Sequence, residues 1–224
     1  MTSQEQEFSA SRRPQEREEY RSEGYVLLTG LFPAEILRRL HSQIREALGA
    51  SQSQAFVKDS VLLTKPAIEV YSQEYPRLSA FLWGLTPRVA EIAGVELMPS
   101  YAYFRLYQRG DVCKVHSDRP ACEHSLSLVL ELSDAIPWPL AIGHEHRARP
   151  STTVESDFGS ERYSALPMSA GDAVMYRGVN HRHGRIDPNP NQWSAHLFMH
   201  WVDAAGPYAD HAFDQVKLMG AQAS

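Results

Sequence analysis

Two residue types that ligate metals lie two positions apart in the segment His116-Ser117-Asp118. In an extended strand the side chains of residues i and i+2 point to the same face, so this imidazole and this carboxylate can reach one ion. A histidine from elsewhere in the chain would complete a set of two histidines and one carboxylate. That donor set is typical of Fe(II) and leaves three coordination positions open for a cosubstrate and O2. The pair therefore offers two candidate ligands of an iron centre, and the flanking sequence has to support that interpretation.

The sequence around this pair is rich in short strands. Residues 101–107 alternate, with Tyr101, Tyr103, Arg105 and Tyr107 on one expected face. Many short strands without helical crossovers predict an antiparallel, mainly β fold with flanking helices, either a sandwich or a jelly roll. The polar segment 144–160 is expected to be a long surface loop. Further runs typical of strands are found at 24–29, 126–132, 139–143, 172–176 and 193–202.

Helices are expected on the N-terminal side of these strands, within about residues 33–94. Pro33 opens the first helix and Gly49 ends it. A second helix is predicted over 76–92, with Thr86-Pro87 kinking or dividing it. The apolar positions that recur at helical spacing are Ile36, Leu37, Leu40, Ile44 and Leu48 in the first and Leu78, Phe81, Leu82, Leu85, Val89 and Ile92 in the second. Residues 1–18 are rich in Gln, Glu, Arg and Ser, which predicts a flexible arm.

Composition narrows the class of protein. At 224 residues with 43% hydrophobic residues, the chain is long enough for one substantial core, so residues 19–224 are expected to form a single domain. A net charge of -5 gives no reason to expect nucleic acid as a partner, and no apolar run is long enough to cross a membrane. The two cysteines, Cys113 and Cys122, are too few for a disulfide framework and are expected to be buried, inert thiols in a cytoplasmic protein.

The flanking residues resemble a known family. The stretch Tyr107-Gln-Arg-Gly-Asp-Val-Cys-Lys-Val-His-Ser-Asp is similar to the segment that carries the iron ligands in prolyl-hydroxylase-like Fe(II)/2-oxoglutarate-dependent dioxygenases. Gly171-Asp-Ala-Val-Met-Tyr resembles that family's Gly-Asp strand, and His183-Gly-Arg-Ile-Asp-Pro resembles its metal histidine element. The resemblance extends from about residue 24 to 202. It implies a double-stranded β-helix, the cupin-like jelly roll, with its core at about 98–202.

The resemblance also implies a set of site residues. Iron would be held by His116, Asp118 and one further histidine, for which His183 is preferred over His181 because Gly184 and Pro188 reproduce the family element. The family's basic residue for the distal carboxylate of 2-oxoglutarate is expected near 192–194, where this sequence has Gln-Trp-Ser. Arg185, on the same strand face as His183, is the leading substitute. Tyr107 and then Arg105 are the other candidates for cosubstrate binding, and no catalytic residue is expected beyond the metal site.

The function implied by this resemblance is that of an oxygenase. With Fe(II), 2-oxoglutarate and O2, it would hydroxylate a small molecule or a peptidyl residue and release succinate and CO2. Two other classes of protein remain open at this stage: a cupin-like protein that binds a small ligand, and a metal-dependent hydrolase that uses the same triad. Substrate identity is expected to depend on the loops at 51–75 and 144–160. Neither the substrate nor the oligomeric state follows from the sequence.

Overall fold

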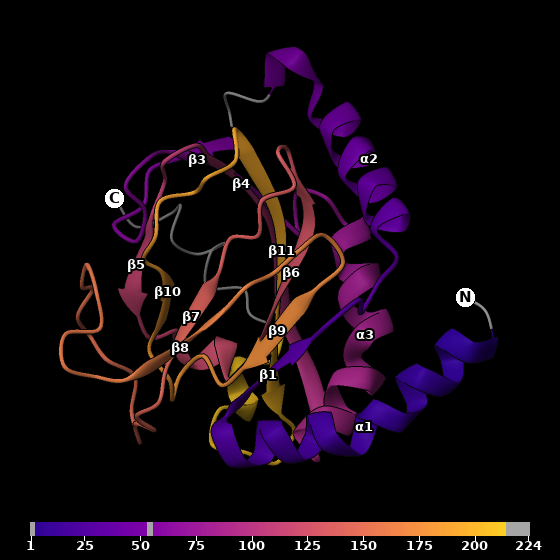
Figure 1. The fold of residues 1–224 in the computed structure, drawn as a ribbon, viewed down its shortest axis with the longest axis vertical. Coiled ribbons are helices and arrows are strands. Elements are labelled where there is room, and N and C mark those ends of the chain that lie inside the picture. Colours follow the sequence, from indigo (N-terminus) through magenta and orange to yellow (C-terminus); the bar gives the residue numbers. More distant parts are fainter. Residues whose placement is uncertain (1–2, 53–55, 214–224) are drawn as a thin grey trace.

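The computed structural model describes residues 3–52 and 56–213, and among these the side chains of residues 12–49 and 56–213. Its strands form two antiparallel sheets that face each other (Figure 1). The larger sheet has the order β1-β9-β6-β11-β4-β3-β2 and the smaller one β5-β10-β7-β8. The strands of the larger sheet are β1 (Tyr25–Leu28), β2 (Val57–Lys58), β3 (Ala67–Tyr71), β4 (Leu97–Gln108), β6 (His124–Leu132), β9 (Ala173–Tyr176) and β11 (Trp193–Asp203). Those of the smaller sheet are β5 (Cys113–His116), β7 (Leu140–Gly143), β8 (Tyr163–Leu166) and β10 (His183–Arg185).

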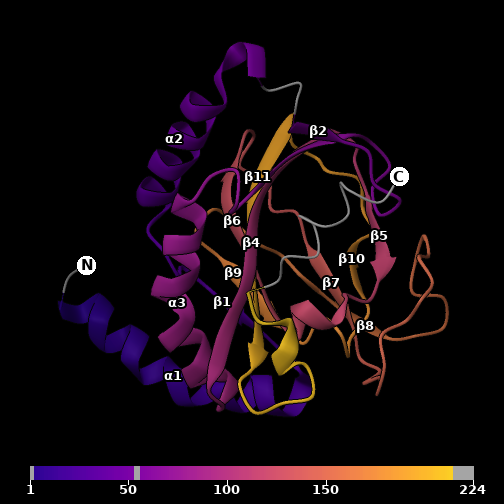
Figure 2. The ribbon, with the colours of Figure 1, turned by 180° about the vertical axis from the view of Figure 1, so that it is seen from behind.

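Three helices cover the outer face of the larger sheet and its lower end: α1 (Ser3–Glu23), α2 (Ala34–Gln52) and α3 (Arg77–Ala93). Seen from behind, α2 and α3 lie on one side of β4 and β11, and the smaller sheet lies on the other (Figure 2). Two short 3₁₀ turns, η2 (Pro120–Cys122) and η3 (Ala209–His211), complete the elements of the described chain. This arrangement confirms the predicted mainly β jelly roll with flanking helices. None of the described helices is apolar and long enough to span a bilayer.

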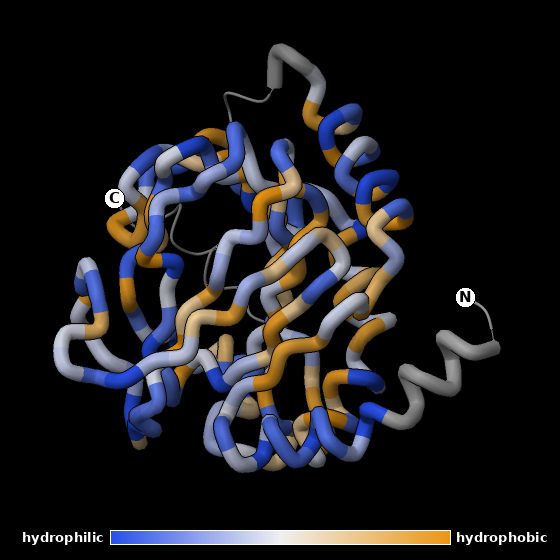
Figure 3. Tube along the Cα trace, viewed as in Figure 1, coloured by the Kyte–Doolittle hydropathy of each residue, from blue (hydrophilic) through white to orange (hydrophobic). Residues whose placement is uncertain are grey.

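The main core lies between the helices and the larger sheet. Apolar residues gather along the strands and on the inner sides of the helices (Figure 3). The alternation in 101–107 sends Ala102 and Phe104 into this core, and it turns Tyr101, Tyr103, Arg105 and Tyr107 toward the space between the sheets. The pleat of β4 therefore places apolar side chains on the core face and polar side chains on the opposite face. The space between the two sheets is lined by these polar side chains and can hold a functional site.

Two details of the predicted helices differ in the structure. Ile36 is 52% exposed, because Leu37, the next residue around the helix, takes the place against the sheet. Helix α3 continues through Pro87 without being divided. The hydroxyl of Thr86, next to the proline, donates to the carbonyl of Leu82 within the same helix at 3.0 Å. Gly49 does interrupt helical geometry in α2, with φ of 58°.

From the sequence, residues 1–18 are expected to be a flexible arm; in the structure residues 3–18 belong to helix α1, and residues 1 and 2 lie outside the described residues. Charged side chains of this helix pair with α3: Arg13 with Glu91, and Glu16 with Arg88. Near its end, Tyr20 is fully buried, and its hydroxyl lies 2.7 Å from Nδ1 of His124 on β6. This N-terminal segment is too polar to form a core of its own, and its contacts with α3 and β6 order it instead.

The Tyr20–His124 contact predicts a pH-dependent stability. Burial, followed by the charge of Arg177, lowers the pKa of His124 to about 4. Because the unfolded-state pKa is near 6.5, the unfolded chain binds the proton first, and stability falls as the pH drops from about 6.5 to about 4. The loss should reach about 3 kcal/mol, at 1.36 kcal/mol per pKa unit. We expect His124→Gln, which keeps an acceptor for Tyr20, to remove this part of the pH dependence in urea unfolding. An unchanged pH dependence in the variant would contradict it.

Candidate metal centre and the cavity around it

Strands β5 and β10 bring the two histidines of the predicted centre together. In their antiparallel pairing His116 lies opposite His183, and the two ring centroids are 4.5 Å apart. Asp118 follows β5, and its Oδ1 lies 3.6 Å from Nε2 of His116 and 3.5 Å from Nε2 of His183. One ligand atom from each of the three residues lies within 4.8 Å of the others. The structure thus assembles the predicted donor set.

Backbone carbonyls fix the orientation of both imidazoles. Nδ1 of His116 lies 2.7 Å from the carbonyl of Lys114, and Nδ1 of His183 lies 3.0 Å from that of His181. A carbonyl can only accept, so each Nδ1 carries a proton and each Nε2 points toward Asp118, where it can ligate a metal ion. Burial would raise the pKa of Asp118, but the neighbouring His183 and His116 hold it well below its usual range. Two imidazoles and a carboxylate therefore converge, and a bound divalent cation would take the place of the protons on the two Nε2 atoms.

His181, the alternative third ligand, does not join this group. Its Nδ1 donates to the carbonyl of Gly143 at 2.9 Å, and its ring packs against Tyr25 and His146. A Cβ added to Gly24 would lie 2.3 Å from Nε2 of His181. The ring is thus wedged beside the turn into β1, away from Asp118, and the geometry favours His183 as the third donor.

Gly178, which the sequence did not single out, makes room for Asp118. Its carbonyl accepts the backbone N–H of Asp118 at 2.8 Å, and an added Cβ would lie 2.3 Å from Oδ2 of the same residue. Backbone and carboxylate both lie against this one glycine. Asp118 can keep its position only while residue 178 lacks a side chain.

We therefore expect Gly178→Ala to disturb the metal centre and, because the added Cβ would also lie 2.8 Å from the carbonyl oxygen of Cys122, the turn beside it. The added methyl must push the carboxylate aside, and a misplaced ligand should weaken Fe(II) binding by about 10- to 100-fold, as loss of an outer-shell partner does. Gly84→Ala is a suitable comparison for iron titration, because Gly84 lies within helix α3 and nothing lies within 4 Å of its added Cβ. Equal iron affinity in Gly178→Ala and the wild type would contradict this role.

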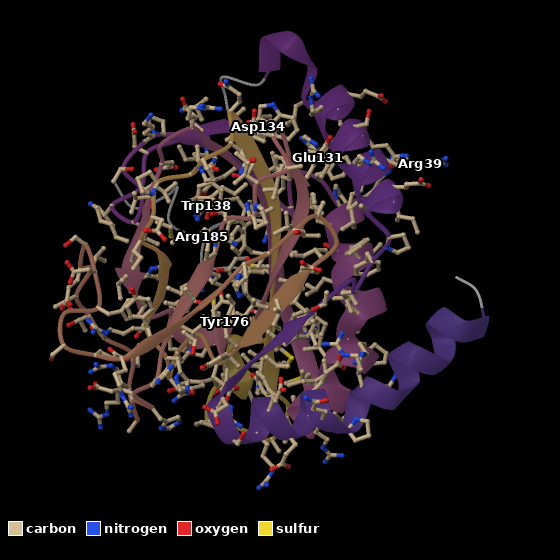
Figure 4. All side chains as sticks on the ribbon, viewed as in Figure 1. Arg39, Glu131, Asp134, Trp138, Tyr176 and Arg185 are labelled. Atoms are coloured by element: carbon tan, nitrogen blue, oxygen red, sulfur yellow. The ribbon has the colours of Figure 1, made fainter. Side chains whose placement is uncertain are left out.

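Arg185 lies in the same interior as the metal centre, beside Trp138 in Figure 4, while Arg39 points outward from α2. Its side chain is 1% exposed, and its guanidinium lies 4.9 Å from the centroid of the Trp138 ring. Its hydrogen-bond partners are the carbonyl of Trp138 and neutral groups of Ser127, Met168 and His196. Among the described residues no carboxylate pairs with it. Burial lowers its pKa, yet an arginine remains charged, so this cation lacks an anion.

Arg105 and Tyr107, the other two candidates for cosubstrate binding, differ from Arg185 in the partners that they already have. Arg105 already has an anionic partner, since its Nη2 lies 2.6 Å from Oε1 of Glu69. Its Nη1 donates to the hydroxyl of Tyr107 at 3.0 Å. Tyr107 is buried with its ring edge against Trp138 and His196. We therefore expect a further anion in this cavity to bind Arg185 rather than Arg105, with Tyr107 close to both.

A cavity of about 640 Å³ connects these groups with the surface. Its lining includes Lys58, Asp59, Ser60, Leu62 and residues 151–154, which come from the two regions expected to choose the substrate. Tyr176 at the end of β9 also lines it, a residue that sequence reasoning missed. The ring of Tyr176 lies 4.6 Å from that of His183, and its hydroxyl has no hydrogen-bond partner in the described chain. Its place at the end of the Gly171-Asp172 strand was the only signal in the sequence.

Comparisons with known proteins agree on the fold. No family model matches the chain, and no curated protein sequence matches it. Solved structures do. A non-haem alpha-ketoglutarate-dependent carbocyclase, SnoK from nogalamycin biosynthesis, has 14% identity and a TM-score of 0.68 over 85% of this chain and 83% of its own. A prolyl-4-hydroxylase from Pseudomonas putida has 12% identity and a TM-score of 0.57 over 84% of this chain and 98% of its own.

A third similar structure was solved with ligands. HygX from Streptomyces hygroscopicus, with nickel, 2-oxoglutarate and hygromycin B bound, has 9% identity and a TM-score of 0.63 over 85% of this chain and 87% of its own. The chain therefore has the fold of non-haem, 2-oxoglutarate-dependent enzymes. At these identities the likeness confirms the predicted double-stranded β-helix, and the roles of individual residues remain predictions.

Proposed function

We propose that this protein is a non-haem Fe(II)- and 2-oxoglutarate-dependent oxygenase. The observation that carries the proposal is one cavity that joins the His116–Asp118–His183 group to Arg185, which is buried and has no carboxylate partner among the described residues. The two histidines and the carboxylate suit Fe(II) and leave positions for a chelating cosubstrate and O2. Arg185 suits the far carboxylate of a dicarboxylic keto acid, which would neutralise it.

Each residue has a defined part in this proposal. His116, Asp118 and His183 would hold the ion, and the Arg185 guanidinium would bind the distal carboxylate of 2-oxoglutarate. Tyr107, fixed by Arg105, would contribute a hydroxyl to the same carboxylate. When bound, iron and 2-oxoglutarate supply the oxidising chemistry, with O2 consumed and succinate and CO2 released. The protein excludes water with Leu140 and Phe198, which line the inner cavity, and Trp138 packs against Arg185 behind them.

The substrate class is proposed more coarsely. Because Asp118 occupies the third ligand position, no vacant site is left for a halide, so hydroxylation or desaturation is favoured over halogenation. A cavity of about 640 Å³ that Lys58, Asp59, Ser60, Leu62 and residues 151–154 help to line suits a small molecule or a peptidyl side chain. A cytoplasmic location and the absence of nucleic-acid partners stay predictions from composition.

Succinate formation tests this function against its rivals. The purified chain with Fe(II), 2-oxoglutarate and ascorbate is screened over small molecules and peptides, and we expect a substrate to stimulate succinate release with equal consumption of O2. His116→Ala should abolish release. A product formed without 2-oxoglutarate would instead indicate a metal-dependent hydrolase. Tight ligand binding with no succinate from any substrate would indicate a cupin-like binding protein.

A further inference from the structure

A second group of metal-ligating side chains lies on the other side of Asp118. One ligand atom each from Asp118, Cys122 and His200 lies within 4.8 Å of the others. Cys122 ends the turn η2, which packs on β11, and His200 belongs to β11. Cys122 and His200 are each 2% exposed, and all three residues line the cavity. None of this group except Asp118 has a part in the proposed function.

The two oxygens of Asp118 face different groups. Oδ1 lies 3.6 Å and 3.5 Å from the histidines of the first centre, whereas Oδ2 lies 3.2 Å from Oγ of Ser125. Oγ of Ser125 in turn lies 2.8 Å from Nδ1 of His200. The carboxylate can therefore give one oxygen to each of two ions.

The surroundings prepare His200 and Cys122 as ligands. When the hydroxyl of Ser125 donates to Asp118, its oxygen can accept a hydrogen bond from Nδ1 of His200. Nε2 of His200 then carries the lone pair that can ligate a metal. The hydroxyl of Tyr101 lies 3.1 Å from Sγ of Cys122 and can donate to a thiolate. Both ligands thus have the kind of outer-shell partner that orients metal-binding side chains.

We infer that Asp118, Cys122 and His200 form a second metal site, which binds a soft divalent cation and shares Asp118 with the iron centre. Thiolate, imidazole and carboxylate together suit Zn(II), for which a thiolate is a preferred ligand. In a tetrahedral zinc site neighbouring ligand atoms lie roughly 3.5 Å apart, so the three side chains need only small shifts to close on an ion. The fourth position faces the cavity. The inference does not depend on the oxygenase activity.

Cobalt(II) is the probe for this site, because a thiolate ligand gives Co(II) an intense charge-transfer band in the near ultraviolet, whereas a histidine–carboxylate site gives only weak visible bands. We expect the anaerobic, metal-free full-length chain to bind two Co(II) ions and to develop the thiolate band. Cys122→Ser should bind one ion, with the thiolate band lost and the visible bands kept. Zn(II) should displace the thiolate-bound cobalt from the wild type.

Cys113→Ser is the matched control. Cys113 is also buried and also lines the cavity, but it belongs to neither ligand group. It should keep both ions and the thiolate band. The inference is wrong if the wild type shows no thiolate band at any cobalt ratio, or if the band persists in Cys122→Ser and vanishes in Cys113→Ser. The anaerobic complex with Fe(II) and 2-oxoglutarate is measured separately, so this outcome would leave the oxygenase proposal standing.

Discussion

Replacement of Arg185 by methionine is expected to weaken 2-oxoglutarate binding by about 100-fold while leaving iron binding unchanged. Such a loss corresponds to about 2.8 kcal/mol, which is in the range for hydrogen bonds to charged groups. Methionine fills much of the same space without a charge. Because the buried guanidinium lacks an anionic partner in the described chain, the metal-free variant should be no less stable than the wild type.

The choice of keto acid separates a carboxylate anchor from a structural arginine. Wild-type protein should strongly prefer 2-oxoglutarate over 2-oxobutyrate, which has the same chelating end and no distal carboxylate. In Arg185→Met this preference should nearly vanish, because only the distal carboxylate contacts Arg185. Arg39→Ala, which removes an exposed arginine of α2, is the matched control and should retain the wild-type preference. A preference that survives in Arg185→Met would assign the anchor to another residue, with Arg105 next in order.

His183→Ala is expected to lower Fe(II) affinity by more than the 10- to 100-fold that loss of an outer-shell partner costs. It removes one of three direct ligands. His181→Ala should retain iron, since the ring of His181 packs beside Gly24 and its Nδ1 donates to Gly143. Calorimetric titration of both variants with Fe(II) under nitrogen measures the difference, and unfolding midpoints without metal check that both variants fold.

The reverse result would be decisive. If His181→Ala lost iron and His183→Ala kept it, the pairing of β5 with β10 would not describe the centre, and the third ligand would be His181. His116→Ala serves as the positive control, because its imidazole lies opposite His183 in the same pair of strands.

The parts of the site that the sequence predicts are those that follow from local geometry. His116 and Asp118 share a face because they lie two residues apart on an extended backbone, and this holds in any strand. The alternation over 101–107 likewise separates the core face from the cavity face without knowledge of the rest of the fold. Both predictions use only the period of a strand.

The parts that failed or stayed open depend on distant partners. His181 and His183 lie two residues apart and would share one face of a strand, so spacing alone does not distinguish them as ligands. Only the register that pairs His183 with His116 does. Composition marks residues 1–18 as an arm, because it does not reveal that Glu16 pairs with Arg88. The missing counter-ion of Arg185 and the contact of Gly178 with Asp118 are likewise properties of the assembled barrel.

The visible spectrum of the anaerobic complex tests the proposed function most directly. Fe(II) and 2-oxoglutarate added to the chain under nitrogen should produce a charge-transfer band, because chelation of the keto acid to an iron with open positions creates it. The band should saturate at one iron and one 2-oxoglutarate per chain, and it should be absent from His116→Ala. Absence of the band in a folded wild-type protein that binds Fe(II) would contradict the proposal that this centre works with 2-oxoglutarate.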